Sequence, residues 1–168
     1  MTLKSPLSNA EIEQLAQQLG KVLLQRGATI TLAESCTGGG IAQAITAVPG
    51  SSQWFEYGFV TYANQAKQQL LSVEDQVLQH QGAVSQPVVE QMALGAINAS
   101  GADYAIAVSG IAGPDGGTSE KPVGTVWICW VTPTKNHSQR FRFAGDRRSI
   151  REQAIKISLQ EVLQQIIE

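Results

Sequence analysis

The stretch TLAESCTGGGIAQAI, residues 31–45, joins a strand pattern to a helix pattern through a glycine-rich turn. Its first residues continue the β-rich run ATITLAE, and its last residues follow a helical spacing that ends at Pro49 and Gly50. A strand that leads through a tight turn into a helix is the repeating unit of parallel α/β sheets. The stretch therefore predicts an α/β fold, and it raises the question whether Ser35 is a nucleophile or part of a helix cap.

The rest of the chain repeats this alternation. Further strands are expected in YGFVTYA, ADYAIAVSG, VGTVWICWV and SQRFRFAG, and helices over residues 7–27, 64–72, 73–82, 85–101 and 146–167. We expect Ser8 or Asn9, Asn64 and Asp146 to cap three of these helices. The alternation predicts a layered fold with helices on both faces of the sheet, and the final two strands predict a hairpin that makes the sheet mixed.

Composition limits the class of protein. A chain of 168 residues suits a single domain, residues 1–168, and its charged fraction of 15% is low for a soluble domain. The small charged fraction favours a homo-oligomer, and a net charge of -2 argues against nucleic acid as a partner.

The location follows from what the sequence lacks. The N-terminal MTLKSPLSNAEIEQ has no apolar core of a signal peptide, and no apolar run is long enough to span a membrane. Cys36 and Cys129 are expected to be free thiols, and His80 and His137 have no second ligand at metal spacing. We therefore expect a cytoplasmic protein without a membrane partner or a metal ion.

Three segments follow the expected parallel strands directly: AESCTGGG, TYANQAK and AVSGIAGPDGG. Because ligands bind beyond the carboxyl ends of parallel strands, these segments are expected to meet in one crevice. The candidate site residues are Ser35, Cys36, Thr37, Gly38, Gly39, Tyr62, Lys67, Ser109, Gly110, Gly113, Asp115 and Gly116.

Each of these candidates also has an ordinary structural explanation. A serine or threonine before a helix commonly caps it, a cysteine is often a small buried side chain, and an aspartate in GPDGG is first a turn residue. The chain contains neither a P-loop nor a dinucleotide-binding fingerprint. Residue types alone therefore leave the chemistry open.

The motifs taken together resemble the CinA C-terminal domain family. The matching stretches, between Thr29 and Arg151, are AESCTGG, GSSQWFEYGFVTYANQAK, GAVSQPVVEQMA, SGIAGPDGGTSEKPVGTVW and FAGDRRSIR. Gln86 departs from the family pattern, in which glutamate is common at this position. The resemblance implies a three-layer α/β/α fold with a mixed, mostly parallel sheet of about five strands. It also implies a cofactor-free Ser–Lys amidohydrolase that converts nicotinamide mononucleotide (NMN) to nicotinate mononucleotide and ammonia in NAD salvage.

The family's serine and lysine correspond to Ser35 and Lys67, and physical reasoning supports the pair. A serine hydroxyl needs an adjacent base, and a lysine is a base only when neutral. Lys67 lies in the first turn of its expected helix, where the helix dipole disfavours an ammonium group. Burial in the crevice would lower its pKa as well.

The other candidates receive supporting roles. Tyr62 is expected to hold the lysine or relay its proton, and the backbone N–H groups from Cys36 to Gly39 are expected to bind the oxyanion. The substrate phosphate is assigned to SGIAGPDGG, Lys121 or the arginines of GDRRSIR, without a ranking.

Two alternatives stay open at this point. The glycine loops would equally suit a non-catalytic nucleotide-binding or interaction module. Cys36 could be the nucleophile of a cysteine amidase, although no histidine lies in the three crevice segments to activate it.

Overall fold

The computed structural model describes residues 7–168. Its elements are α1 (Leu7–Arg26), β1 (Ile30–Glu34), α2 (Gly40–Thr46), a short 3-10 helix (Ser51–Gln53), β2 (Phe55–Val60), α3 (Asn64–Leu71), α4 (Asp75–Gln81), α5 (Gln86–Ser100), β3 (Tyr104–Gly110), β4 (Thr125–Val131), β5 (Asn136–Arg142) and α6 (Arg147–Ile167). The expectations for one domain over 1–168 and for the N-terminal segment include residues 1–6, which lie outside the described residues.

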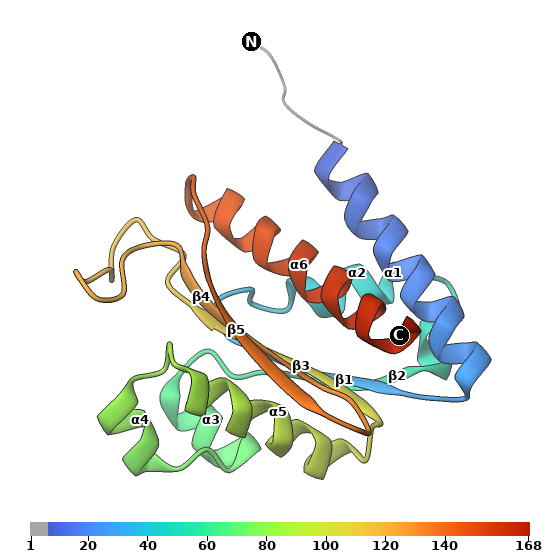
Figure 1. Ribbon diagram of the computed structural model, residues 1–168, viewed down its shortest axis with the longest axis horizontal. Coiled ribbons are helices and arrows are strands. Elements are labelled where there is room, and N and C mark those ends of the chain that lie inside the picture. The colour runs from blue at the N-terminus through green and yellow to red at the C-terminus, as the bar shows by residue number, and fades with distance from the viewer. Residues whose placement is uncertain (1–6) are drawn as a thin grey trace.

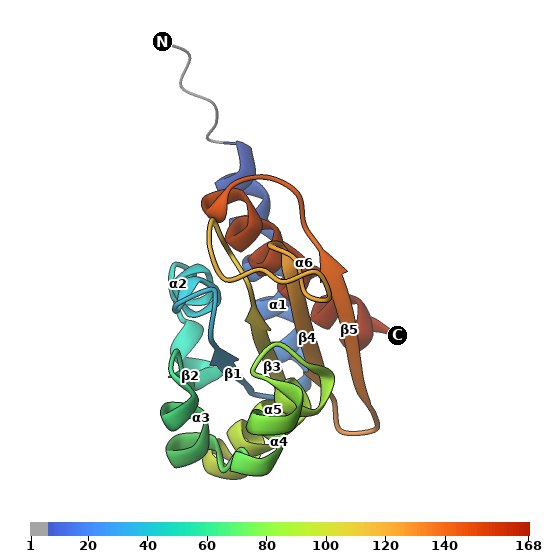
Figure 2. The same cartoon turned by 90° about the vertical axis from the view of Figure 1, so that its left-hand side faces the viewer.

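The five strands form one mixed sheet in the order β2-β1-β3-β4-β5 (Figure 2). β1 pairs in parallel with β2 and β3, whereas β4 is antiparallel to both β3 and β5. All strands except β4 therefore run in the same direction. The expected α/β fold with a final hairpin and a mixed sheet is confirmed.

Helices cover both faces of this sheet (Figure 1). α1, α2 and α6 pack on one face, and α3, α4 and α5 pack on the other. Each interface has its own apolar core, one around Trp54 and Trp130 and one around Met92 and Leu71. Burial of these side chains, at about 1.5–3 kcal/mol for each large aliphatic side chain, holds the three layers together. Within residues 7–168, no helix combines the length and apolar character that a membrane span requires.

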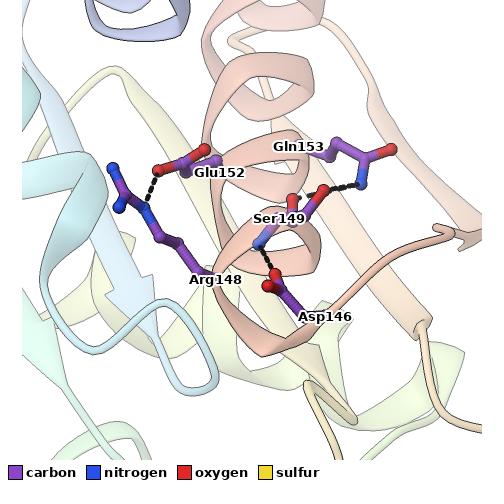
Figure 3. A network of polar contacts seen from close by, with 5 residues as sticks. All are labelled: Asp146, Arg148, Ser149, Glu152 and Gln153. Carbon is purple, nitrogen blue, oxygen red and sulfur yellow. Dashed lines mark hydrogen bonds and ion pairs between the residues drawn. The ribbon is translucent and has the colours of Figure 1, made fainter. Parts of the chain in front are cut away.

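Two helix starts differ from the sequence prediction. Asp146 caps α6 as expected, since its carboxylate accepts a hydrogen bond from the Ser149 N–H at 2.8 Å (Figure 3). The expected cap Asn64 is instead the first residue of α3, and the cap position is taken by Ala63, which has no side-chain acceptor. Residues 8–9 lie inside α1 and do not precede it. Both errors shift a boundary by a residue or two, within the fraying of helix ends.

The register of the parallel strands sets three hydroxyl residues side by side. Glu34 pairs with Val60 of β2 and with Val108 of β3, so that the next residues are Ser35, Thr61 and Ser109. The pairing continues one step, because the Thr61 N–H donates to the Glu34 carbonyl at 2.8 Å. Ser35 thus stands at the carboxyl end of the central parallel strand.

Candidate active site

Ser35 and Lys67 meet at this end of the sheet. The Lys67 Nζ, carried by the first turn of α3, lies 3.1 Å from the Ser35 Oγ. The same Nζ donates to the backbone carbonyl of Thr61 at 2.8 Å and to that of Tyr62 at 3.3 Å. Lys67 is 1% exposed and Ser35 is 8% exposed, so that little water reaches the pair. Two residues far apart in the sequence therefore form a direct contact that suits proton transfer.

Burial governs the charge state of Lys67. Removal of the ammonium from water lowers the pKa of Lys67 below its ordinary 10.5. In the part of the chain that the structure describes, no carboxylate forms an ion pair with Nζ to oppose this effect. A Cys36 thiolate would oppose it, but burial raises the pKa of the Cys36 thiol to about 12 and keeps that group neutral. The site therefore shifts the protonation equilibrium of Lys67 toward the neutral amine.

The lowered pKa predicts a pH-dependent stability. The folded chain binds fewer protons at Lys67 than the unfolded chain does between the lowered pKa and 10.5. Stability therefore rises with pH through this window, and the cost of burying the amine is fully present below it. The free energy of unfolding of the parent, minus that of Lys67→Met, is expected to rise as the pH approaches 10.5 from below, by at most about 1.4 kcal/mol per pH unit. Urea unfolding at several pH values measures this difference, and a flat profile would contradict the lowered pKa.

The environment of Cys36 bears on the cysteine alternative. The side chain is 6% exposed, and burial raises the pKa of its thiol to about 12. A thiol is a weak nucleophile until it ionises, and here it stays protonated near neutral pH. The side chain that contacts the Lys67 amine is that of Ser35.

The turn between β1 and α2 presents backbone N–H groups beside Ser35. Gly38 and Gly39 have φ angles of 59° and 92°, in the left-handed region that favours glycine. The Gly38 N–H donates to the Ser35 carbonyl at 3.0 Å, so that one of the expected oxyanion donors is already used inside the turn. Among the described residues, the N–H groups of Thr37 and Gly39 meet no hydrogen-bond acceptor.

Neither Ser35 nor Thr37 caps α2. The cap position belongs to Gly39, which has no side chain, and the capping is done by Glu34, the last residue of β1. Its carboxylate accepts hydrogen bonds from the Ile41 N–H at 2.9 Å and from the Thr37 hydroxyl at 2.7 Å. From its sequence, Glu34 is expected only as the end of a strand. The sequence did contain a signal for this role, namely a glutamate at the end of an almost wholly apolar strand. A buried carboxylate needs hydrogen-bond donors around it.

Arg151 of α6 holds the same turn from another element. Its Nε donates to the Cys36 carbonyl at 3.1 Å, and its Nη2 donates to the Thr37 carbonyl at 3.0 Å. The peptide groups 36–37 and 37–38 are thus bound by Arg151 through their oxygens. Arg151 is one of the arginines expected from the sequence as candidates for the substrate phosphate, and in the structure its guanidinium donates to this turn.

Arg147 joins the other two crevice segments. Its Nη1 donates to the Gly113 carbonyl at 2.9 Å, and its Nη2 donates to the Tyr62 hydroxyl at 3.0 Å. The expected contact between the Tyr62 side chain and Lys67 is absent from the described contacts: the hydroxyl meets Arg147, and the backbone carbonyl of Tyr62 meets the lysine. The tyrosine ring is 61% exposed.

The remaining phosphate candidates also contact protein groups. Arg148 forms an exposed ion pair with Glu152 one turn along α6 (Figure 3). Lys121 donates from Nζ to the Gln81 carbonyl at 2.6 Å, which ties the β3–β4 loop to the end of α4.

The other predicted substrate-binding residues spread outward from the serine. Ser109 and Gly110 end β3, and Ser109 is buried in the row that contains Ser35. Gly113 belongs to the loop held by Arg147, and Asp115 and Gly116 stand exposed farther along it. In residues 7–168, no group of three or more His, Cys, Asp or Glu side chains is placed to hold a metal ion.

A buried contact between Ser35 and Lys67 lies at the carboxyl edge of the mixed α/β sheet and marks the candidate site. The model of the CinA C-terminal domain matches residues 12–166. The chain belongs to this family.

Curated relatives and solved structures agree with this assignment. The nicotinamide-nucleotide amidohydrolase PncC of Escherichia coli K12 is 52% identical over 163 residues, which cover 96% of this chain and 99% of the relative. The protein of the same name from Pseudomonas putida is 54% identical over 153 residues, with 91% and 96% covered. The crystal structure of the competence/damage inducible protein CihA from Agrobacterium tumefaciens superposes with a TM-score of 0.91 at 39% identity and covers 100% of both chains.

Proposed function

We propose that this protein hydrolyses the carboxamide of NMN to give nicotinate mononucleotide and ammonia, with Ser35 as nucleophile and Lys67 as general base. The observation that carries the mechanism is the 3.1 Å contact between the Lys67 Nζ and the Ser35 Oγ in a buried setting. The substrate follows from the relatives, which cover nearly the whole chain and are named as nicotinamide-nucleotide amidohydrolases.

The contacts of Lys67 suit the acylation step. A neutral amine has two hydrogens and one lone pair, and the carbonyls of Thr61 and Tyr62 accept the two hydrogens. The lone pair then faces the Ser35 hydroxyl and takes its proton while Oγ attacks the carboxamide carbon. When the C–N bond breaks, Lys67 returns this proton to the departing nitrogen, which leaves as ammonia.

Deacylation uses the same groups in reverse. A water molecule gives a proton to Lys67 and attacks the acyl carbon of the Ser35 ester. The C–O bond to the serine then breaks, and Oγ recovers its proton from Lys67. In both steps, the N–H groups of the turn after Ser35 stabilise the tetrahedral oxyanion, a contribution worth about 3–4 kcal/mol per donor in serine hydrolases.

The rest of the substrate is assigned to the same edge of the sheet. Ser109, Gly110 and the loop with Gly113, Asp115 and Gly116 follow β3 and are the proposed binding elements for the mononucleotide. We also propose that the reaction belongs to NAD salvage and that the protein is cytoplasmic. We further propose a homo-oligomer, because a low charged fraction of 15% favours self-association.

Release of ammonia tests the function directly. Purified protein mixed with NMN is expected to form ammonia and nicotinate mononucleotide in equal amounts. A coupled assay measures the ammonia, and chromatography measures the nicotinate mononucleotide. Addition of a chelator is expected to leave the rate unchanged, because the proposed steps use protein groups alone. Calorimetric binding of NMN without ammonia release would favour the non-catalytic nucleotide-binding alternative.

A further inference from the structure

Glu34 is a buried charged residue to which the proposed chemistry gives no step. It is 1% exposed and directly precedes the nucleophile Ser35. Its carboxylate accepts from the Thr37 hydroxyl at 2.7 Å, from the Ile41 N–H at 2.9 Å and from the Ala42 N–H at 3.0 Å. A carboxylate buried this deeply is costly unless donors surround it, so this arrangement is a built feature of the site.

The backbone of Glu34 is a rigid anchor for this carboxylate. The residue pairs with Val60 on one side and with Val108 on the other, in the middle of the parallel part of the sheet. Its carbonyl also accepts from the Thr61 N–H at 2.8 Å. The side chain therefore ties the turn after Ser35, and the start of α2 behind it, to the strand that is paired on both sides in the parallel part of the sheet.

The orientation of the turn peptides decides where their N–H groups point. In a planar trans peptide, the carbonyl and the N–H point in opposite directions. Arg151 binds the carbonyls of Cys36 and Thr37, which directs the N–H groups of Thr37 and Gly38 away from the arginine. The Gly38 N–H donates to the Ser35 carbonyl, so the Thr37 N–H is the donor that this arrangement leaves for the oxyanion. Glu34 binds the Thr37 hydroxyl and opposes rotation of the same peptides from its own side. Two charged side chains of opposite sign thus hold the turn between them.

We infer that Glu34 is a positioning residue, whose carboxylate sets the orientation of the backbone N–H groups that receive the oxyanion. The inference rests on the proposed function and deepens it. Glutamine has the same size but carries a hydrogen-bearing nitrogen in place of one acceptor oxygen. Glu34→Gln therefore turns a donor toward groups that are themselves donors, and the turn must shift.

The test compares Glu34→Gln with an exposed carboxylate, that of Asp103, at the opposite end of β1. Asp103 accepts from the Thr29 N–H at 2.9 Å and from the Thr29 hydroxyl, which are the same kinds of donor. Glu34→Gln is expected to lower kcat for NMN about 30-fold and to change KM by less than about threefold, because the oxyanion forms only in the transition state. Asp103→Asn is expected to keep the parent kcat and KM, and thermal unfolding of both variants measures their stability.

A second readout separates this inference from the choice of substrate. An alkyl fluorophosphonate reacts with an activated serine: the Oγ–P bond forms, fluoride leaves, and the serine proton passes to Lys67. The phosphoryl oxygen then takes the place of the oxyanion, so Glu34→Gln is expected to slow this reaction about 30-fold as well. A parent that is phosphonylated but does not hydrolyse NMN would reject the proposed substrate, and the rate of phosphonylation would still decide the role of Glu34. A parent that reacts with neither compound overturns both proposals.

Two results for a folded variant would overturn the positioning role. One is a Glu34→Gln enzyme with kcat within about threefold of the parent. The other is an equal loss in Asp103→Asn that follows the loss of stability. If Glu34→Gln does not fold, Thr37→Val removes one of the three contacts, and we expect about a fivefold lower kcat, most of which Thr37→Ser restores because it keeps the hydroxyl. Equal rates for Thr37→Val and the parent would overturn the inference.

Discussion

Replacement of Ser35 by alanine is expected to lower kcat for NMN hydrolysis at least about a thousandfold, because binding and oxyanion stabilisation then remain without a nucleophile. The Ser35 Oγ is the hydroxyl that contacts the buried Lys67 amine, at 3.1 Å. Initial rates of ammonia release measure the loss. The variant is expected still to bind NMN, since alanine removes a single atom from the proposed site. Calorimetry measures this binding.

The neighbouring cysteine is the matched control for this variant. Cys36→Ala is expected to keep kcat within about tenfold of the parent, because a thiol that stays protonated supplies no nucleophile. Burial raises the pKa of this thiol to about 12, which makes the serine the stronger candidate at neutral pH. An inactive Cys36→Ala enzyme together with an active Ser35→Ala enzyme would reverse the assignment.

The sequence predicted the fold well because its signals are local. Apolar runs such as residues 104–110 and helical spacings such as residues 86–100 encode their own period. The rule that ligands bind beyond the carboxyl ends of parallel strands then placed Ser35 and Lys67 at one edge of the sheet. Their contact depends on the register of β1 against β2 and on the start of α3, which the structure supplies.

The hydrogen bonds that hold the turn after Ser35 could not be predicted from the sequence. Glu34 and Arg151 act on the same turn, yet they are separated by most of the chain, and no local pattern links them. Tyr62 was expected to contact Lys67 through its side chain, but it contacts the lysine through its backbone carbonyl. A backbone contact could not be predicted from the residue type, because every residue has a carbonyl. Long-range polar contacts of this kind depend on tertiary packing.

The second large effect concerns the charge of Lys67. Lys67→Arg is expected to be nearly as inactive as Lys67→Ala, with kcat at least about a thousandfold below the parent, because a guanidinium stays charged and accepts no proton from serine. The arginine is also too large for a position that is 1% exposed, so folding of the variant must be verified by circular dichroism. Lys156→Arg, on the exposed side of α6, is the control and is expected to match the parent.

The pH profile of the parent separates a base from a fixed positive charge. A lysine that acts as a base must be neutral, so kcat/KM is expected to rise with pH through an apparent pKa below the ordinary 10.5, and to level off above it. The direction follows from burial, which disfavours the ammonium in the folded enzyme. If Lys67 instead held the substrate through its charge, activity would fall as the amine lost its proton, and arginine would replace it at modest loss. An active Lys67→Arg enzyme with a falling profile would therefore remove Lys67 as the base and leave Ser35 without an activating group.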